Sequence, residues 1–330
     1  MDAKGQAPVD RFNAALRSIT FAGAFFLFAL SLPAALPGLA PPSMDLPSHF
    51  ALQYLIASVI LLGWSFYPLE TGRETKIILA LAFLANIAVL APYLPLSRAP
   101  ETATGKPLKI LQTNILYLNT RPAAFQALVA QEKPDIIFVM ETNSAFAKVL
   151  RAMKADYPYQ NIMPENQWAD GLALLSKAPL ENLQVLNLKN AAMPGYAFGI
   201  GQGKEKIEFV ALHTMNPLHG VEIRDASFTG VEKRYQTGAP QNLVVLGDLN
   251  ASPWCPALQR FTHALPGMRN ARAGRGLFLS WPTFLPFFMR IPIDHTLVSD
   301  NIAVTDYRLG PDIGSDHFPV IATLAPGRVK

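Results

Sequence analysis

The stretch LGDLNASPW, residues 246–254, places two polar side chains at the end of an apolar run. The run that leads into it, NLVVL, is apolar enough to form a strand buried on both faces, whereas Asp248 and Asn250 stand two residues apart where the run stops. A buried carboxylate is costly unless it binds a cation or several hydrogen-bond donors. A lone strand-end aspartate often only caps the next turn, so its meaning depends on the rest of the chain.

The same pattern recurs at other apolar runs. Each of these runs carries a polar group at or near its end: Asn114 in LQTNIL, Glu141 after DIIFVM, His213 after FVAL, Asp294 and His295 in IPIDHTLVS, and Ser315, Asp316 and His317 before FPVIATL. Carboxylates gathered at one edge of a sheet indicate a shared cation site.

The pattern of apolar residues in this part of the chain is typical of an α/β domain. Several expected strands are apolar on both faces, as in sheets covered on both sides, and the expected helices carry apolar residues at helical spacing. We expect helices over 122–133 and 144–157, and strands over 109–118, 135–142, 171–177, 206–214, 242–250, 291–299 and 318–324.

Read in order, these pieces resemble the endonuclease/exonuclease/phosphatase superfamily, the DNase-I-like metal-dependent phosphoesterases. The resemblance covers about residues 107–324 and rests on QTNI, ET, GLALLSK, LHTMNP, GDLN, PIDH and GSDHFPV. A lone G-D-x-N is weak evidence, but a later S-D-H and an earlier strand-end glutamate make the set specific. The resemblance implies an α/β (α+β) fold, the DNase-I-like four-layer α/β sandwich, and hydrolysis of phosphodiester bonds.

The resemblance also assigns a metal site and a histidine pair. Glu141 would be the principal ligand of Mg²⁺ or Mn²⁺, supported by Asn114 and Asp316. His317 and Asp294 would form a pair in which the carboxylate fixes the imidazole tautomer and stabilises its protonated form.

The remaining roles concern water and phosphate. Asp248 would orient or activate the attacking water, and Asn250 would hold that water or a phosphate oxygen. His213 would donate to the phosphate or the leaving group, and Asn216 would be a second, looser phosphate contact. Whether the aspartate or the histidine is the base stays open. His295 would point to the opposite face of its strand and is left out of the site.

One further segment bears on the substrate. Residues 249–293 contain no Asp or Glu, but they contain Arg260, Arg269, Arg272, Arg275 and Arg290 among Trp254, Phe261, Trp281, Phe284, Phe287 and Phe288. A basic, aromatic rim would grip a nucleic-acid backbone and stack on bases. It would equally rest on a membrane through SWPTFLPFFMRIP. Alternatively, the aromatics belong to the core and the arginines to an ordinary surface.

The N-terminal third is too apolar for a soluble domain. In a chain of 330 residues that is 50% hydrophobic and 16% charged, three stretches free of charged residues occur at 19–39, 50–69 and 77–96. Each has about the 20 residues that a helix needs to cross a bilayer. We therefore expect a membrane anchor with three transmembrane helices over 1–97, a linker over 98–106 and the phosphoesterase domain over 107–330.

The basic residues beside these spans predict an orientation. Lys4, Arg11 and Arg17 precede the first span, and Arg73 and Lys76 lie between the second and third. By the positive-inside rule the N-terminus is cytoplasmic. Three crossings then place the catalytic domain on the periplasmic, outer face of a bacterial inner membrane.

The favoured function is a membrane-tethered, divalent-metal-dependent phosphodiester hydrolase of endonuclease or exonuclease type. Two alternatives stay open: a lipid phosphodiesterase or phosphatase of sphingomyelinase-like or phosphoinositide-like character, and a catalytically inactive binding module. The expected partners are a phosphodiester substrate, with nucleic acid favoured and lipid possible, and the lipid bilayer; no protein partner is inferred. The choice of substrate and the endo or exo mode do not follow from the sequence.

Overall fold

The computed structural model describes residues 3–67, 70–96, 101–164 and 169–329. The chain divides into a helical unit, Met1–Pro92 with Trp254–Pro256, and a sheet unit, Tyr93–Pro253 with Ala257–Lys330. The end of the expected span 50–69, at residues 68–69, and the start of the expected linker 98–106, at residues 98–100, lie outside the described residues.

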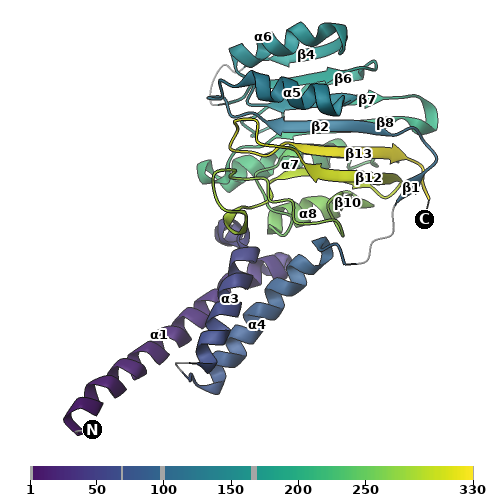
Figure 1. Ribbon diagram of the computed structural model, residues 1–330. Coiled ribbons are helices and arrows are strands. Elements are labelled where there is room, and N and C mark those ends of the chain that lie inside the picture. Colours follow the sequence, from purple (N-terminus) through teal and green to yellow (C-terminus); the bar gives the residue numbers. More distant parts are fainter. Residues whose placement is uncertain (1–2, 68–69, 97–100, 165–168, 330) are drawn as a thin grey trace. The chain divides into compact units, whose positions relative to one another are not determined.

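The helical unit is built from α1 (Ala3–Ala35), α2 (Asp45–Ser48), α3 (Ala51–Phe66) and α4 (Arg73–Leu90), with single 3-10 turns at Pro37–Leu39, Pro42–Met44 and Ala91–Tyr93. α1, α3 and α4 lie side by side (Figure 1) and share a buried cluster that includes Leu27 and Leu79. The Asn86 amide of α4 donates to the Ser31 hydroxyl of α1 at 2.8 Å. α1 ends just before Pro37, because the residue ahead of a proline is disfavoured in the helical conformation.

Two segments of this unit are long and apolar enough to cross a membrane, Asp10–Ala35 and Arg73–Tyr93. A third segment is a bent pair, Pro42–Ser48 and Ala51–Phe66, whose axes differ by 68°. The described residues therefore offer two candidate spans, or three if the bent pair acts as one.

The sheet unit contains two six-stranded sheets and a short strand pair. The first sheet has the order β10 (Met268–Asn270), β11 (Asp294–Ser299), β9 (Leu243–Asp248), β8 (Ile207–His213), β7 (Gly195–Ile200), β6 (Glu181–Leu186). The second has the order β12 (Ile302–Leu309), β13 (Val320–Pro326), β2 (Leu108–Asn114), β3 (Ile136–Met140), β5 (Leu172–Ser176), β4 (Tyr159–Met163). β1 (Thr102–Ala103) pairs with β14 (Arg328–Val329), so part of the expected linker is a strand.

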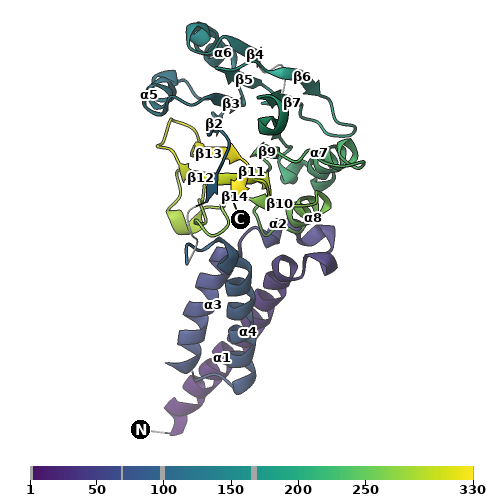
Figure 2. The ribbon, with the colours of Figure 1, turned by 90° about the vertical axis from the view of Figure 1, so that its right-hand side faces the viewer.

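The two sheets face each other, and helices cover their outer faces (Figure 2). Alternation along β2 and β3 explains the layers: Ile110 and Phe138 enter the core between the sheets, whereas Leu111 and Ile137 face α5 (Pro122–Glu132) and α6 (Ser144–Ala152). On the far side, α7 (Val221–Arg234) and α8 (Pro256–Ala264) meet through stacked rings of Phe228 and Phe261, 4.8 Å apart. The mixed α/β architecture with sheets covered on both sides agrees with the prediction.

The topology brings the polar strand ends to one edge. β2 and β3 are parallel, as are β8 and β9, so the carboxyl ends of each pair lie together. β11 runs antiparallel to β9 and begins there, with Asp294 opposite Asp248. β13 runs antiparallel to β2 and starts opposite Gln112, which places the residues before it at the same edge. Every polar strand end named from the sequence therefore comes to one region.

Candidate active site

Glu141 leaves β3 in a left-handed turn. Its φ is 57°, a conformation that a non-glycine residue adopts only when its surroundings hold it. Its carboxylate accepts hydrogen bonds from the backbone N–H of Tyr117 at 3.0 Å and from the Asn114 amide at 2.9 Å. These bonds aim the carboxylate across the ends of β2 and β3.

Asp248 ends β9 and shares the Asn114 amide with Glu141. Its carboxylate accepts the Asn114 amide at 3.2 Å and the backbone N–H of Asn250 at 3.0 Å, and its side chain is almost fully buried. Asn250 is itself left-handed, with φ 46°, and its amide donates to the carbonyl of Thr214 at 2.8 Å. The GDLN turn thus directs Asp248 toward Asn114 and fixes Asn250 beside it.

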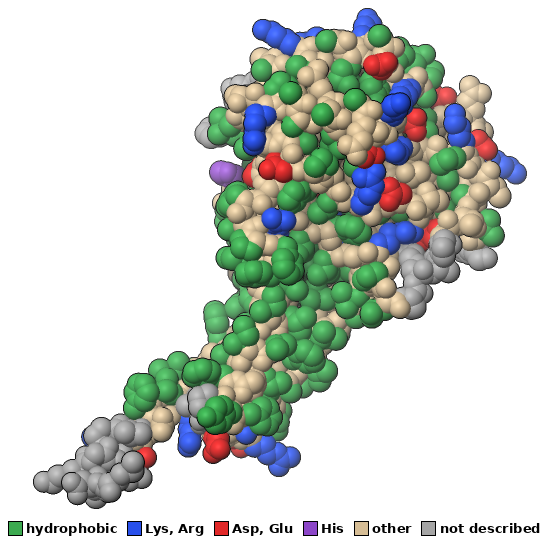
Figure 3. Space-filling view, in the orientation of Figure 1, with side chains coloured by type: hydrophobic (Ala, Val, Ile, Leu, Met, Phe, Trp, Pro, Cys, Tyr) green, Lys and Arg blue, Asp and Glu red, His purple; other side chains and the backbone are tan. Residues whose placement is uncertain are grey.

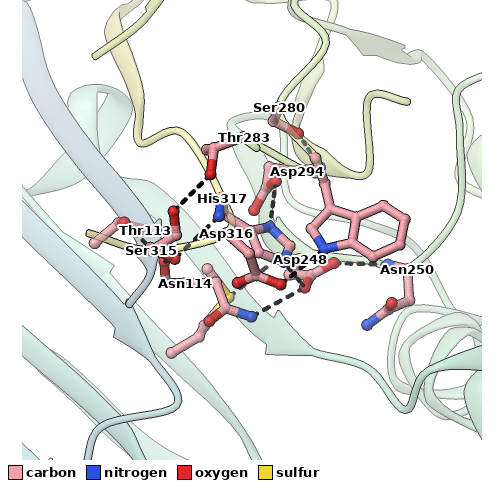
Figure 4. A network of polar contacts seen from close by, with 12 residues as sticks. Thr113, Asn114, Asp248, Asn250, Ser280, Thr283, Asp294, Ser315, Asp316 and His317 are labelled. Atoms are coloured by element: carbon pink, nitrogen blue, oxygen red, sulfur yellow. Dashed lines mark hydrogen bonds and ion pairs between the residues drawn. The ribbon is translucent and has the colours of Figure 1, made fainter. Parts of the chain in front are cut away.

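His317 joins two carboxylates, as Figure 4 shows. Its Nδ1 lies 2.9 Å from Asp294 Oδ2, and its Nε2 lies 3.7 Å from Asp248 Oδ2. The backbone N–H of His317 donates to the Ser315 hydroxyl at 3.0 Å, and that hydroxyl donates to the carbonyl of Asn114 at 2.7 Å. The expected His317 and Asp294 pair is therefore formed, with Asp248 on the other ring nitrogen.

Burial and charge together shift the pKa values of this group. Burial by itself would lower the pKa of His317, but the carboxylates of Asp294 and Asp248 outweigh it and raise that pKa to about 10. Burial raises the pKa of Asp248 to about 7, against the opposing effect of His317. The carboxylates therefore favour the protonated imidazole of His317, whereas burial raises the pKa of the neighbouring Asp248 to about 7.

His213 lies close to the carboxylates of both Glu141 and Asp248. Its Nε2 is 3.8 Å from Glu141 Oε1 and 3.8 Å from Asp248 Oδ2. Its pKa is lowered, chiefly because burial disfavours the charged ring, although Glu141 acts in the opposite direction. A neutral imidazole at this position can donate one hydrogen bond to a phosphoryl or leaving oxygen.

Two sequence-predicted residues have local structural partners. The Asp316 carboxylate accepts the indole N–H of Trp281 at 2.9 Å. The Asn216 side chain caps the turn Pro217–His219 by accepting the N–H of Leu218 at 3.0 Å. Metal binding by Asp316 and phosphate binding by Asn216 stay predictions.

A family model describes most of the sheet unit. The endonuclease/exonuclease/phosphatase family matches residues 111–317, which is more than half of the chain. The chain belongs to this family. Family membership makes it a phosphoesterase hydrolase, and no curated protein sequence matches the chain significantly.

Solved structures share the fold at low sequence identity. D. rerio TDP2 complexed with a single-strand DNA product is 14% identical, with a TM-score of 0.57 over 66% of this chain and 99% of that one. The catalytic domain of human Nocturnin is 18% identical, with a TM-score of 0.55 over 69% and 100%. The 3' phosphatase NExo from Neisseria, bound to a product DNA hairpin, is 19% identical, with a TM-score of 0.51 over 65% and 98%. These likenesses establish the fold.

The donor set fits the divalent cation on which this family depends. Glu141 and Asp248 present carboxylate oxygens on either side of Asn114, and hard oxygen ligands are those that Mg²⁺ and Mn²⁺ prefer. Asp248, Asp294 and His317 also place ligand atoms within 4.8 Å of one another, but Asp294 and His317 already pair.

Three further groups hold predicted site residues in place. The backbone N–H of Tyr117, the Ser315 hydroxyl and the Trp281 indole each hold a predicted site residue. In the sequence, Trp281 stands out only as one of several aromatic residues in 249–293, and nothing there connects it with Asp316. His295 is excluded from the site as expected: its ring nitrogens lie 2.9 Å from the Asn270 amide and 2.6 Å from the carbonyl of Ala251.

The expected basic rim of residues 249–293 is not formed by most of its arginines. Arg272 is fully buried and donates to the carbonyls of Asp294 and Leu277. Arg269 and Arg275 surround the buried carboxylate of Glu101, at 3.0 Å and 3.8 Å. These guanidinium groups serve the interior, so they provide no cationic groove for a phosphate backbone.

Proposed function

We propose that this family member is a membrane-tethered, divalent-metal-dependent phosphodiester hydrolase that uses an activated water. One observation carries the proposal. The His317 imidazole lies between Asp294 and Asp248, and Asp248 shares the Asn114 amide with Glu141. In-line hydrolysis of a phosphodiester needs a group that takes a proton from water, positive charge near the phosphoryl oxygens and help for the leaving oxygen.

The shifted pKa values support Asp248 as the base in this proposal. A general base works best when its pKa lies near the working pH, and the pKa of Asp248 is raised to about 7. His317 keeps its proton because its pKa is raised to about 10, so it serves as a cation that stabilises charge on the phosphoryl oxygens. In this assignment Asp248 Oδ2 takes the proton from water, and Asn250 orients that water. Neutral His213 donates a hydrogen bond to the leaving oxygen, which takes its proton from bulk water.

A Mg²⁺ or Mn²⁺ ion held by Glu141, with Asn114 beside it, would act as a Lewis acid on a phosphoryl oxygen. Glu141 is positioned for this by the N–H of Tyr117. Asp294 does not join that set in our proposal, because its carboxylate orients the imidazole of His317.

Nucleic acid is the first substrate to test. Support comes from two proteins with this fold: D. rerio TDP2 is complexed with a single-strand DNA product, and NExo from Neisseria is bound to a product DNA hairpin. A lipid phosphodiester is the second candidate, favoured by exposed phenylalanines on a segment tied to His317's turn.

The test uses the full chain in detergent micelles, freed of metal. We expect hydrolysis of single- or double-stranded DNA, or of bis(p-nitrophenyl) phosphate, only after Mg²⁺ or Mn²⁺ is added. Asp248→Asn should lower turnover by about 10²–10⁴-fold, the usual contribution of a general base, with little change in the thermal unfolding midpoint.

The matched control is Asp300→Asn, which makes the same chemical change just past the other end of β11, where Asp300 is exposed. It should keep wild-type turnover. Near-normal turnover in Asp248→Asn, with the control unchanged, would overturn the assignment of the base.

We further propose that the helical unit anchors the protein in a bacterial inner membrane, with the N-terminus cytoplasmic and the phosphoesterase domain outside. The proposal is supported by the two apolar helices of spanning length, and by the basic residues Lys4, Arg11 and Arg17 before and within the N-terminal part of the first of them.

A further inference from the structure

Four large apolar side chains stand exposed within six positions of the segment that precedes β11. Phe284 exposes 75% of its surface, Phe287 68%, Met289 46% and Phe288 44%. Clusters of this kind on a soluble surface mark interaction sites, because each ring in water forgoes burial. We propose that residues 284–289, here called the aromatic loop, dock into the headgroup and acyl boundary of a lipid bilayer. The inference rests on the membrane tether of the proposed function.

Several backbone carbonyls in and beside the aromatic loop accept hydrogen bonds from nearby residues of the same segment. Arg290 donates through Nε to the carbonyl of Leu285 at 2.7 Å and through Nη2 to that of Thr283 at 2.9 Å. The N–H of Met289 donates to the carbonyl of Pro286 at 2.9 Å. Because lipid offers no hydrogen-bond partners, the internal pairing of these three carbonyls lowers the cost of placing the loop in the interface.

The surroundings of the loop favour lipid over nucleic acid. Surfaces that stack on bases combine aromatic rings with a cationic groove that follows the phosphates. Here Arg269 and Arg275 hold Glu101, and Arg272 is buried, so these arginines do not line such a groove. The same chain also carries helices long and apolar enough to enter a bilayer.

The aromatic loop is tied to the active site. Thr283 donates its N–H to the carbonyl of Asp316 and its hydroxyl to that of Ser315, both at 2.8 Å. Two other loops that leave the site edge carry exposed leucines, Leu118 after β2 at 66% and Leu218 after β8 at 76%. Docking through these apolar side chains would present the His317 side of the site to phosphoesters at headgroup depth.

The test measures depth, not hydrolysis. On a Cys255→Ala background, Phe287→Cys is labelled with the fluorophore NBD, and the full chain is reconstituted in phosphatidylethanolamine and phosphatidylglycerol vesicles. The control is Lys204→Cys, labelled alike, on the exposed turn Gly203–Glu205 at the opposite end of β8. We expect the probe at 287 to emit at shorter wavelength, to be quenched by shallow doxyl-labelled lipids and to resist iodide, and the probe at 204 to do none of these. Adding Phe284→Ser should reduce the lipid quenching at 287.

Two outcomes would overturn the inference. In one, both probes are quenched equally by iodide and neither by doxyl lipids. In the other, single-stranded DNA, rather than lipid, protects the probe at 287, which makes the loop a nucleic-acid surface. A protein that docks but hydrolyses no phosphodiester would contradict the proposed function while leaving the docking inference intact.

Discussion

Asp294 determines how His317 behaves, because a buried imidazole without a carboxylate partner would lose its proton. Burial opposes the charge on His317, and the carboxylates at 2.9 Å and 3.7 Å from its two ring nitrogens reverse that effect. The shorter contact, with Asp294, also fixes the orientation of the His317 ring. Asp248, at the longer distance, cannot replace that role.

We therefore predict that Asp294→Asn lowers the pKa of His317 from about 10 toward its ordinary value near 6.5. NMR titration of the His317 ring in the metal-free full chain measures this change directly. Because the pKa of His317 is higher in the folded than in the unfolded chain, its pairing with Asp294 stabilises the fold fully below about pH 6.5. This contribution to stability disappears as the pH rises through about 10. An unchanged titration midpoint in Asp294→Asn would show that Asp248 alone holds the proton.

The site could be predicted where its chemistry is local in the sequence. Asp248, Asp294 and His317 each stand beside an apolar run, and the order of these runs identifies their edge. The N–H of Tyr117 and the indole of Trp281 could not be predicted in the same way, because their roles arise only when loops distant in sequence meet Glu141 and Asp316. The geometry shows which groups approach each other, whereas the sequence indicates only which side chains are available.

Gly247 shows why the turn motif contains a glycine that does no chemistry. It lies in β9 with φ 131°, opposite Leu212 of the parallel strand β8. A Cβ at this position would stand 1.8 Å from the carbonyl oxygen of Leu212. Since that carbonyl belongs to a central strand, the clash could be relieved only by separating β8 from β9.

We predict that Gly247→Ala lowers the free energy of unfolding of the sheet unit by at least ~3 kcal/mol, or prevents its folding. The control is Gly238→Ala, whose φ of 130° is nearly the same but whose added methyl would meet no atom within 4 Å. It should cost only the backbone strain, about 1 kcal/mol. Thermal and denaturant unfolding of both variants decide the matter, and equal losses would refute the steric explanation.

Element prediction succeeded where a buried strand belongs to an apolar run and failed where exposed positions or glycines hide the strand signal. The central strands β3, β5 and β9 are buried at every position and are mainly apolar in sequence. β11 is also buried throughout, but Asp294 and His295 make its start polar. The edge strand β6 is mostly exposed and polar, and β7 is built as GYAFGI, in which two glycines hide the strand signal. α7 contributes only a few buried residues, including the charged Arg224, so its apolar face is too narrow to recognise.

At the scale of the whole chain, composition indicates helices apolar enough to span a membrane, but not how many of them would cross it. α1 and α4 each hold a candidate span, whereas α3 has 16 residues, about 24 Å of helix, which is short of a hydrocarbon core of about 30 Å. The bent approach through Pro42–Ser48 supplies the missing length only if both pieces enter the membrane together. Otherwise the segment is a re-entrant loop that returns to the side from which it came.

The parity of the crossings makes the topology testable. Three spans place the N-terminus and the phosphoesterase domain on opposite sides, and two place them on the same side. We expect alkaline phosphatase fused after Lys330 to be active in bacterial cells, and the same reporter fused after Ala40, on the outer side of the first span, to be active as well. A fusion after Gly72, between the second and third spans, should be inactive, because the basic residues that follow hold that loop inside. If the fusion after Gly72 is active while that after Lys330 is not, the bent segment is re-entrant, and the active site faces the cytoplasm.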